Sequence, residues 1–412
     1  MSRTDLIMFD DARAGAWQPF TLTRPAGELL LGAFTARARA ERITGMSCIG
    51  HVAADLDGFE EAGAPRVVAL DSVATEHPRV FLCSRALLDW KAKDHIDALQ
   101  PGAFRVGDDA AGWFAPAGAP NPSLQDLTSI AGARAAASSL PGRVLENVWD
   151  LVAANPQQII ADFDAFRTDD DDGVADGTAQ FASINYSPGD LRLGTGVTIE
   201  PNVVFDFSHG PIWLDDDVTV RAFTRLAGPC YVGRGSTLLG GPYDAVSIGP
   251  VCRIHGEVEE SIILGYSNKA HDGFLGHAYL GRWVNLGAMT TNSDLKNNYG
   301  NVRLWTPDGD QDTGTMKLGC LLGDHVKTGI GSLINTGTVV GAGSNLFGTD
   351  MPPKYVAPFS WGSGSDLVAY DVDKFLAVAA TAMSRRKVEL SDGMRGMLRN
   401  AWQRARSGDA RA

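Results

Sequence analysis

The sequence predicts an α/β domain, then a parallel β-solenoid, then a helical tail along its 412 residues. Short apolar runs alternate with helix-like segments in the first part, a period of six residues begins near residue 189, and this period stops at Pro352-Pro353-Lys354. Glycine divides the chain in the same way, with 15 of the 47 glycines before residue 181 and 32 after it. The predicted parts are the α/β domain 1–168, an acidic linker 169–188, the solenoid 189–350 and a helical C-terminal extension 351–412.

The first part has the alternation of an α/β domain. Its strand candidates are apolar and short, and they are Leu6–Phe9, Met46–Ile49, Arg66–Leu70 and Arg79–Cys83. A helical stretch is expected over Ser123–Phe166. The acids of Asp169–Asp172 are followed by Gly173 and Gly177, and an acid run of this kind is usually a solvated linker.

The period of six residues predicts the solenoid. It is clearest in the last five repeats, whose leading residues are Leu322, Thr328, Ile334, Val340 and Leu346. A helix needs a period near 3.6 and an ordinary strand a period of 2, so neither explains it. Six residues can form one side of a triangular prism with the leading residue pointing inward, and the repeats predict about five coils.

The repeat loses its phase twice, between Ile254 and Leu280 and between Leu286 and Leu322. We expect loops to leave the coil at both places. Most groups capable of chemistry lie in these gaps, and polar loops on a rigid scaffold are where sites usually occur.

Composition excludes several classes of protein. A net charge of -13 argues against nucleic acid or an anionic membrane as the main partner. No apolar run approaches the ~18 residues that span a bilayer, so we expect a cytoplasmic protein. The five cysteines are scattered without a Cys-x-x-Cys pair, which indicates reduced thiols rather than disulfides or a zinc site.

The basic C-terminal end departs from this acidic background. Residues 384–412 contain eight basic and three acidic side chains. The segment either packs on an acidic neighbouring subunit or binds an anionic cofactor.

The hexapeptide pattern resembles the left-handed parallel β-helix of acyltransferases. Residues 262–276 and 279–288 look like the acetyltransferase half of GlmU-type bifunctional enzymes, and Phe9-Asp10-Asp11 with Leu22-Thr23-Arg24-Pro25 resemble their sugar nucleotidyltransferase domain. The resemblance implies acetyl transfer from acetyl-CoA to an amino-sugar 1-phosphate, with glucosamine-1-phosphate as the first expectation. It also implies nucleotidyl transfer from UTP or another nucleoside triphosphate to give a UDP-N-acetylglucosamine-type product, and a homotrimer with the cofactor site between subunits.

His271 matches the catalytic histidine of that family. Acetyl transfer requires a neutral amine, so a base with a pKa near neutrality should reach it, and histidine is suited to this role. The resemblance further implies substrate or acetyl-CoA binding by Arg253, Lys269, Asn285, Asn298 and Tyr299. Two of these have a plain alternative, because Asn285 could simply stack at a coil corner and Lys269 could be solvated.

The nucleotidyltransferase half supplies a second set of candidates, which are Asp10, Asp11, Arg13, Thr21, Arg24 and Arg37. An active domain of this kind would need Mg²⁺, because phosphoryl chemistry requires neutralised charge. Asp10-Asp11-Ala12-Arg13 stands where the family has Gly-x-Gly-Thr-Arg. Either the arginines replace that phosphate cradle or the domain has lost catalysis.

Three residues depart from the acetyltransferase pattern. Glu259 stands at a family lysine that contacts the sugar phosphate, His255 at a phosphate arginine and Phe274 at a tyrosine. Two alternatives therefore remain open. One is a non-catalytic sugar-nucleotide-binding scaffold, and the other is a γ-carbonic-anhydrase-like zinc enzyme using His255, His271 and His277.

Overall fold

The computed structural model describes residues 3–129, 138–167, 182–187 and 189–407. Most of the predicted acidic linker, including Asp169–Asp172, lies outside the described residues. The chain forms two compact units. The N-terminal unit contains residues 1–29, 34–150 and 391–412, and the solenoid unit contains residues 30–33 and 151–390.

A six-stranded sheet forms the centre of the N-terminal unit and confirms the predicted α/β domain. In spatial order its strands are β4 (Ser47–Val52), β1 (Asp5–Phe9), β5 (Arg79–Cys83), β8 (Asp109–Ala115), β7 (Gly102–Val106) and β9 (Ser138–Leu140). β1 pairs in parallel with β4 and β5, whereas β8 is antiparallel to β5 and β7. The strand expected at Arg66–Leu70 does not form. Only an isolated bridge joins Val67 to His51, because this half-exposed segment has no continuous buried face.

Helices α2 and α6 belong to this unit. Helix α2 (Ala36–Thr44) begins at Thr35, whose hydroxyl accepts a hydrogen bond from the Ala38 N–H, and it ends at Gly45 with φ of 69°. Helix α6 (Asp392–Ser407) is contributed by the C-terminal end of the chain, where Arg404 forms an ion pair with Asp55 at 2.8 Å.

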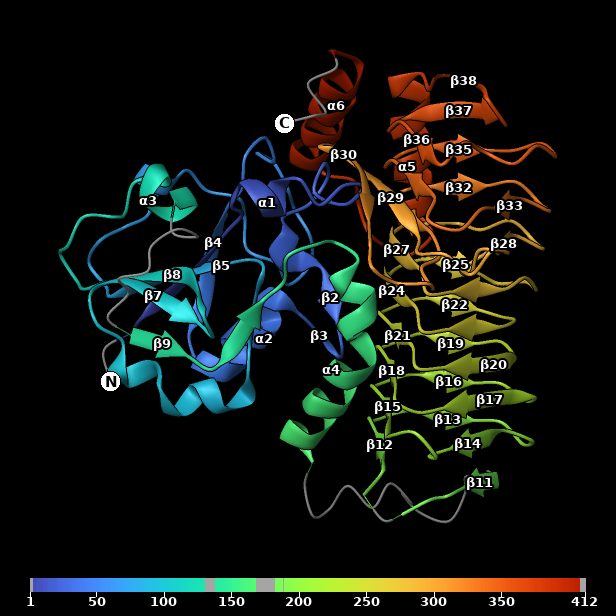
Figure 1. Cartoon of the computed structure of the whole chain (residues 1–412), viewed down its shortest axis with the longest axis horizontal. Coiled ribbons are helices and arrows are strands. Elements are labelled where there is room, and N and C mark those ends of the chain that lie inside the picture. The colour runs from blue at the N-terminus through green and yellow to red at the C-terminus, as the bar shows by residue number, and fades with distance from the viewer. Residues whose placement is uncertain (1–2, 130–137, 168–181, 188, 408–412) are drawn as a thin grey trace. The chain divides into compact units, whose positions relative to one another are not determined.

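The solenoid has three faces, as a triangular coil requires (Figure 1). One face is a nine-stranded parallel sheet. Its strands are β12 (Leu191–Leu193), β15 (Ile212–Leu214), β18 (Cys230–Val232), β21 (Ser247–Ile248), β24 (Ile262–Gly265), β27 (Tyr279–Arg282), β31 (Leu321–Leu322), β34 (Val339–Val340) and β36 (Tyr355–Val356). The second face contains β11 (Ala182–Ile184), β14 (Val204–Asp206), β17 (Thr224–Ala227), β20 (Gly241–Asp244), β23 (Val258–Glu259) and β26 (Leu275–Gly276).

The third face carries the candidate site. Its strands form two groups, and they are β13 (Thr198–Ile199), β16 (Thr219–Val220), β19 (Thr237–Leu238), β22 (Arg253–Ile254) and β25 (Asn268–Lys269), then β32 (Lys327–Thr328), β35 (Asn345–Leu346), β37 (Ser360–Ser363) and the antiparallel β38 (Asp366–Ala369).

The inward residues of the repeat are buried as predicted. Leu214, Val220, Val232 and Val340 belong to one hydrophobic cluster that runs through the solenoid. The prediction of about five coils was wrong, since one face alone has nine strands. Several coils are shorter or longer than 18 residues, so the strict period of six is visible only where no residue is dropped or added.

The prediction of a loop between Ile254 and Leu280 is also wrong, because the coil continues there through β23, β24, β25 and β26. The aliphatic period fails there because Lys269 occupies an inward register position next to Ile254. The second expected loop is present. After β28 (Thr291–Asn292) the chain leaves the coil and forms the antiparallel hairpin of β29 (Arg303–Thr306) and β30 (Gly309–Asp312).

The helical stretch expected over Ser123–Phe166 is two helices, α3 (Leu124–Ser129) and α4 (Asp150–Phe166), with β9 and β10 (Gly142–Val144) between them. The predicted end of the solenoid at residue 350 is too early, because β36 and β37 extend its sheets and β38 pairs with β37. The extension becomes helical only at α5 (Val372–Ser384), which α6 follows. Among the described residues, no helix combines the length and hydropathy needed to cross a bilayer.

Candidate functional site

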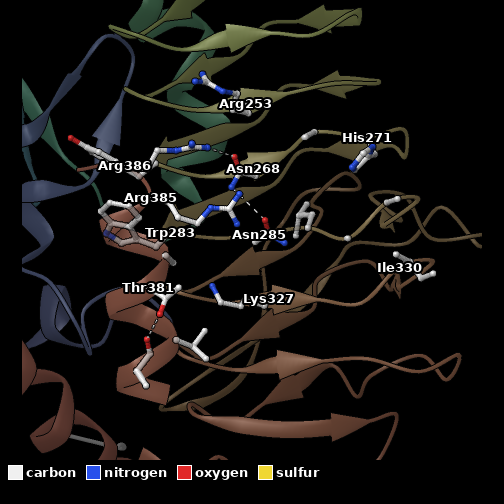
Figure 2. A pocket seen from close by; sticks show the side chains of 18 residues that line it. Arg253, Asn268, His271, Trp283, Asn285, Lys327, Ile330, Thr381, Arg385 and Arg386 are labelled. Atoms are coloured by element: carbon white, nitrogen blue, oxygen red, sulfur yellow. Dashed lines mark hydrogen bonds between the residues drawn. The ribbon is translucent and has the colours of Figure 1, made fainter. Parts of the chain in front are cut away.

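A pocket of about 880 Å³ lies between the third solenoid face and α5 (Figure 2). It brings together three of the predicted residues, His271, Arg253 and Asn285. The solenoid adds Asn268, Trp283 and Lys327 to its lining, and α5 with the residues that follow it adds Thr381, Arg385 and Arg386.

The polar residues of the solenoid wall form one ladder. Arg253 pairs in register with Asn268, Asn268 with Asn285, and Asn285 with Lys327. Each of them directly precedes an inward residue of the coil, so its side chain points outward from the face. In the sequence, a polar residue precedes each inward position. Asn268 and Lys327 were not predicted as site residues, because only the inward residues were used to recognise the coil.

His271 lies in the turn that follows β25, and its side chain is exposed at the pocket. Lys269 supports the backbone of this turn. The Lys269 ammonium donates hydrogen bonds to the carbonyl oxygens of His255, at 2.6 Å, and His271, at 2.9 Å. The backbone of the catalytic candidate is therefore fixed, while its imidazole faces the pocket.

Lys269 does not line the pocket. Its side chain is only 2% exposed, and burial lowers its pKa to about 8. Because both nearby carbonyls use its ammonium group, the structure gives Lys269 a role in supporting the His271 turn rather than in reaching a ligand.

Asn298 and Tyr299 also lie away from this pocket. Asn298 lines a second pocket of about 580 Å³ with Lys296, Arg303, Trp305 and Lys354. Tyr299 is 69% exposed. Both belong to the segment that leaves the coil after β28, so their place in the chain does not bring them to His271 of the same subunit.

The pocket next to His271 is cationic. Burial lowers the pKa of Arg386, and the neighbouring cations Arg253 and Arg385 lower it further. Burial likewise lowers the pKa of Lys327 to about 8. The side chain of Arg386 is oriented by Asn268, whose Oδ1 accepts a hydrogen bond from Arg386 Nη2 at 2.7 Å.

The aspartates predicted for the nucleotidyltransferase half are engaged inside the N-terminal unit. Asp11 Oδ1 accepts a hydrogen bond from the Ala14 N–H, and Asp11 forms an ion pair with Arg85 at 2.6 Å. Burial alone would raise the pKa of Asp11, but the bonds from Arg85 outweigh it and lower the pKa. Asp10 accepts a hydrogen bond from the Ala26 N–H, and burial raises its pKa.

Only one of these two carboxylates is paired with a cation. Asp11 is neutralised by Arg85, whereas burial raises the pKa of Asp10 and leaves its Oδ1 atom without a hydrogen-bond partner. Within the described part of the chain, Asp10 and Asp11 belong to no group of three metal-ligating side chains. The group that does gather is Glu259, Glu260 and His277 on the solenoid.

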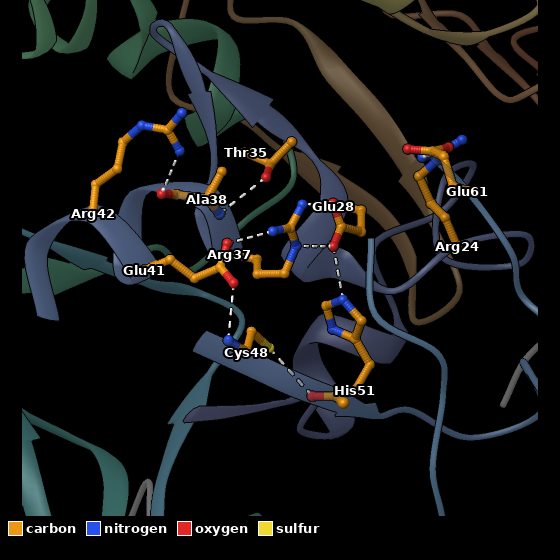
Figure 3. A network of polar contacts seen from close by, with 11 residues as sticks. Arg24, Glu28, Thr35, Arg37, Ala38, Glu41, Arg42, Cys48, His51 and Glu61 are labelled. Atoms are coloured by element: carbon orange, nitrogen blue, oxygen red, sulfur yellow. Dashed lines mark hydrogen bonds and ion pairs between the residues drawn. The ribbon is translucent and has the colours of Figure 1, made fainter. Parts of the chain in front are cut away.

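The arginines predicted for the nucleotidyltransferase half are also paired with carboxylates. Arg13 pairs with Glu146, and the 1% exposed Arg24 pairs with Glu61 at 3.1 Å. Arg37 contacts both Glu28 and Glu41, as Figure 3 shows. Thr21 is buried and donates its hydroxyl hydrogen to the Gly15 carbonyl. This geometry does not present the three arginines as a replacement for the phosphate cradle.

His255, His271 and His277 do not converge within one chain. His277 lies between Asp294 and Glu260, at 2.9 and 3.4 Å, and His255 faces Asp272 at 3.2 Å. An open zinc site needs three ligands about 2 Å from one ion, and these imidazoles have separate partners.

The α/β unit, the three-faced solenoid and the polar pocket on one face define a hexapeptide-repeat protein joined to a nucleotidyltransferase-like domain. Comparisons with known proteins agree with this class. The model of the sugar nucleotidyl transferase family matches residues 6–171.

Three curated relatives are bifunctional enzymes by name. The bifunctional protein GlmU of Sphingopyxis alaskensis is 32% identical over 236 residues, which are 53% of this chain and 46% of that protein. GlmU of Azorhizobium caulinodans is 36% identical over 108 residues, 24% of this chain and 22% of that protein. A bifunctional sugar-1-phosphate nucleotidylyltransferase/acetyltransferase of Sulfurisphaera tokodaii is 32% identical over 91 residues, 22% of this chain and 23% of that protein. The matches thus span less than half the length of these relatives, and they confirm the resemblance to GlmU-like bifunctional enzymes.

Similarity to solved structures is more distant. The Arabidopsis UDP-N-acetylglucosamine acyltransferase is 10% identical with a TM-score of 0.29, covering 51% of this chain and 79% of that chain.

Proposed function

We propose that this chain is an acetyl-CoA-dependent N-acetyltransferase whose acceptor is an amino-sugar 1-phosphate, with glucosamine-1-phosphate as the first choice. The observation that carries the proposal is the single pocket that gathers His271, Arg253 and Asn285 on one solenoid face. The GlmU-like relatives support the same assignment.

The residues suit acetyl transfer in a simple way. The His271 imidazole takes a proton from the ammonium group of the amino sugar, and the neutral amine attacks the thioester carbonyl of acetyl-CoA. The C–S bond breaks as the attacking nitrogen gives up its second proton, and the coenzyme A thiolate accepts that proton and leaves as the thiol. Arg253 offers a planar guanidinium to a phosphate, and Asn285 offers a hydrogen bond to the sugar.

We further propose a cytoplasmic homotrimer in which Asn298 and Tyr299 reach the pocket of a neighbouring copy. Their exposure, and their distance along the fold from His271 of the same chain, support this arrangement. An acetyl-CoA site between subunits would then use residues from two chains.

Nucleotidyl transfer to a UDP-N-acetylglucosamine-type product is the second part of the proposal, but it would need phosphate ligands other than Arg13, Arg24 and Arg37. The carboxylate partners of these arginines favour, as a second candidate, an N-terminal unit that binds or assembles without catalysis.

A coupled assay tests both parts. Acetyl-CoA is supplied with a panel of amino-sugar phosphates while release of the coenzyme A thiol is followed, and each nucleoside triphosphate is then added with Mg²⁺ while pyrophosphate is followed. Thiol release with glucosamine-1-phosphate is the expected result. Failure with every acceptor, alongside tight binding of nucleotide sugars, would replace the transferase by a scaffold.

A further inference from the structure

Four cations line the pocket, and none of its described lining residues carries a carboxylate. The cations are Arg253, Lys327, Arg385 and Arg386 (Figure 2). Like charges held together in a partly desolvated site are costly unless an anion neutralises them. The contrast with the N-terminal unit is direct, because there the predicted arginines have carboxylate partners from the same chain.

Three of the cations form an arginine cluster, which consists of Arg253, Arg385 and Arg386. All three line the same pocket, and Arg253 and Arg385 both act on the charge of Arg386. Asn268 orients Arg386, and Arg253 donates a hydrogen bond to the Thr237 hydroxyl at 2.8 Å. A guanidinium has five N–H donors, so each arginine still has donors for a ligand.

Lys327 lies at the other end of the same ladder. Three strand spacings separate it from Arg253 in register, and at ~4.8 Å per spacing this places their backbones about 14 Å apart. Figure 2 shows Arg253 and Lys327 at opposite ends of the pocket in that view, with the guanidinium groups of Arg385 and Arg386 between them. A second anionic group on the ligand would give Lys327 a partner of its own.

We infer that the pocket holds its ligand at two anionic positions, the arginine cluster and Lys327, so that the ligand carries phosphate groups at two separate places rather than one. This inference deepens the proposed function and rests on it for the identity of the reaction. Glu259, which stands where the family has a phosphate lysine, does not line this pocket.

Two ligands carry phosphate groups at two separate places. One is the acetyl donor, since coenzyme A has a 3′-phosphate and a diphosphate. The other is an acceptor sugar with two phosphate groups. The shared requirement is two phosphates held apart by the body of the ligand.

Calorimetry with simple probes tests the two positions without any turnover. Adenosine 3′,5′-bisphosphate is expected to bind the full chain about tenfold more tightly than adenosine 5′-monophosphate. Lys327→Met should remove this difference and leave the affinity for the monophosphate unchanged, whereas Arg386→Gln should weaken both probes. Lys327→Met is expected to fold, because an apolar chain of similar length replaces a buried cation.

Lys374→Met is the matched control, because Lys374 is an exposed lysine of α5 outside the pocket. It should change neither affinity. Equal binding of the two probes to the unmodified chain would exclude coenzyme A as the source of the two phosphates, and an equal loss of both in Lys327→Met would overturn the inference.

Two further pairs identify the source of the phosphates. They are coenzyme A against dephospho-coenzyme A, and glucosamine 1,6-bisphosphate against glucosamine-1-phosphate. The pair that shows a tenfold difference abolished by Lys327→Met names the donor or the acceptor, and the absence of such a difference in both pairs overturns the inference. A chain that binds in this way but does not acetylate would refute the proposed function alone, and a chain that acetylates but ignores the second phosphate would refute this inference alone.

Discussion

The Tyr279 hydroxyl is bonded to both backbone polar groups of Leu30, a residue 249 positions earlier in the chain. It accepts a hydrogen bond from the Leu30 N–H at 2.8 Å and donates one to the Leu30 carbonyl at 3.0 Å. Tyr279 is fully buried. One side chain therefore satisfies both backbone polar groups of a buried residue in the short strand β2 (Leu30–Leu31).

Tyr279→Phe should lower the free energy of unfolding by about 1–3 kcal/mol, because it leaves a buried N–H and a buried C=O without a partner. Chemical denaturation measures the change. Tyr266→Phe, at a half-buried tyrosine of the same solenoid, is the control and should have little effect. A Tyr279→Phe variant as stable as the control would show that water replaces the lost bonds.

His271→Ala should reduce kcat for acetyl transfer by about 10²–10⁴-fold, the usual contribution of a general base. Thermal unfolding should stay unchanged, because the His271 side chain is exposed. His209→Ala, which removes an exposed imidazole outside the pocket, is the matched control. Acetylation by His271→Ala at the rate of the unmodified chain would end its assignment as the base.

Lys269 should make stability depend on pH. Its folded pKa of about 8 lies below the ~10.4 of an exposed lysine, so between these values the unfolded chain binds the extra proton and stability rises with pH. Relative to Lys269→Met, the unmodified chain should gain about 2–3 kcal/mol between pH 8 and pH 10 in urea titrations. The control Lys374→Met should follow the unmodified chain at every pH, and a Lys269→Met difference that is constant with pH would contradict the prediction.

Arg37→Met should cost about 3–5 kcal/mol of stability at neutral pH, because it leaves the buried Glu28 without its cation. Burial opposes the ionised form of Glu28, and the bonds from His51 and Arg37 overcome this and lower its pKa. Arg13→Met removes an exposed pair and should cost at most about 1 kcal/mol. Equal costs for the two variants would mean that the Arg37 network is not structural.

The sequence predicted those features that depend on local pattern. The inward positions of Leu322 and Val340 follow from a period that only a coil can satisfy. His271 was predicted as the candidate base because its motif resembles that of the family. Lys269 was missed as an inward residue because its burial depends on two carbonyl groups that only the folded turn brings together. Arg385 and Arg386 were noted only as part of a basic tail, since no local pattern states that α5 packs beside the Arg253 ladder.

The two compact units exchange segments in both directions. Residues 30–33 belong to the solenoid unit although residues on both sides of them do not, and residues from Ser391 onward return to the N-terminal unit after the solenoid is complete. No single cut in the chain therefore separates the units intact. A fragment that stops before residue 182 lacks α6, and a fragment that starts there lacks the partner of Tyr279, so independent expression of either half would expose apolar surface that the whole chain covers.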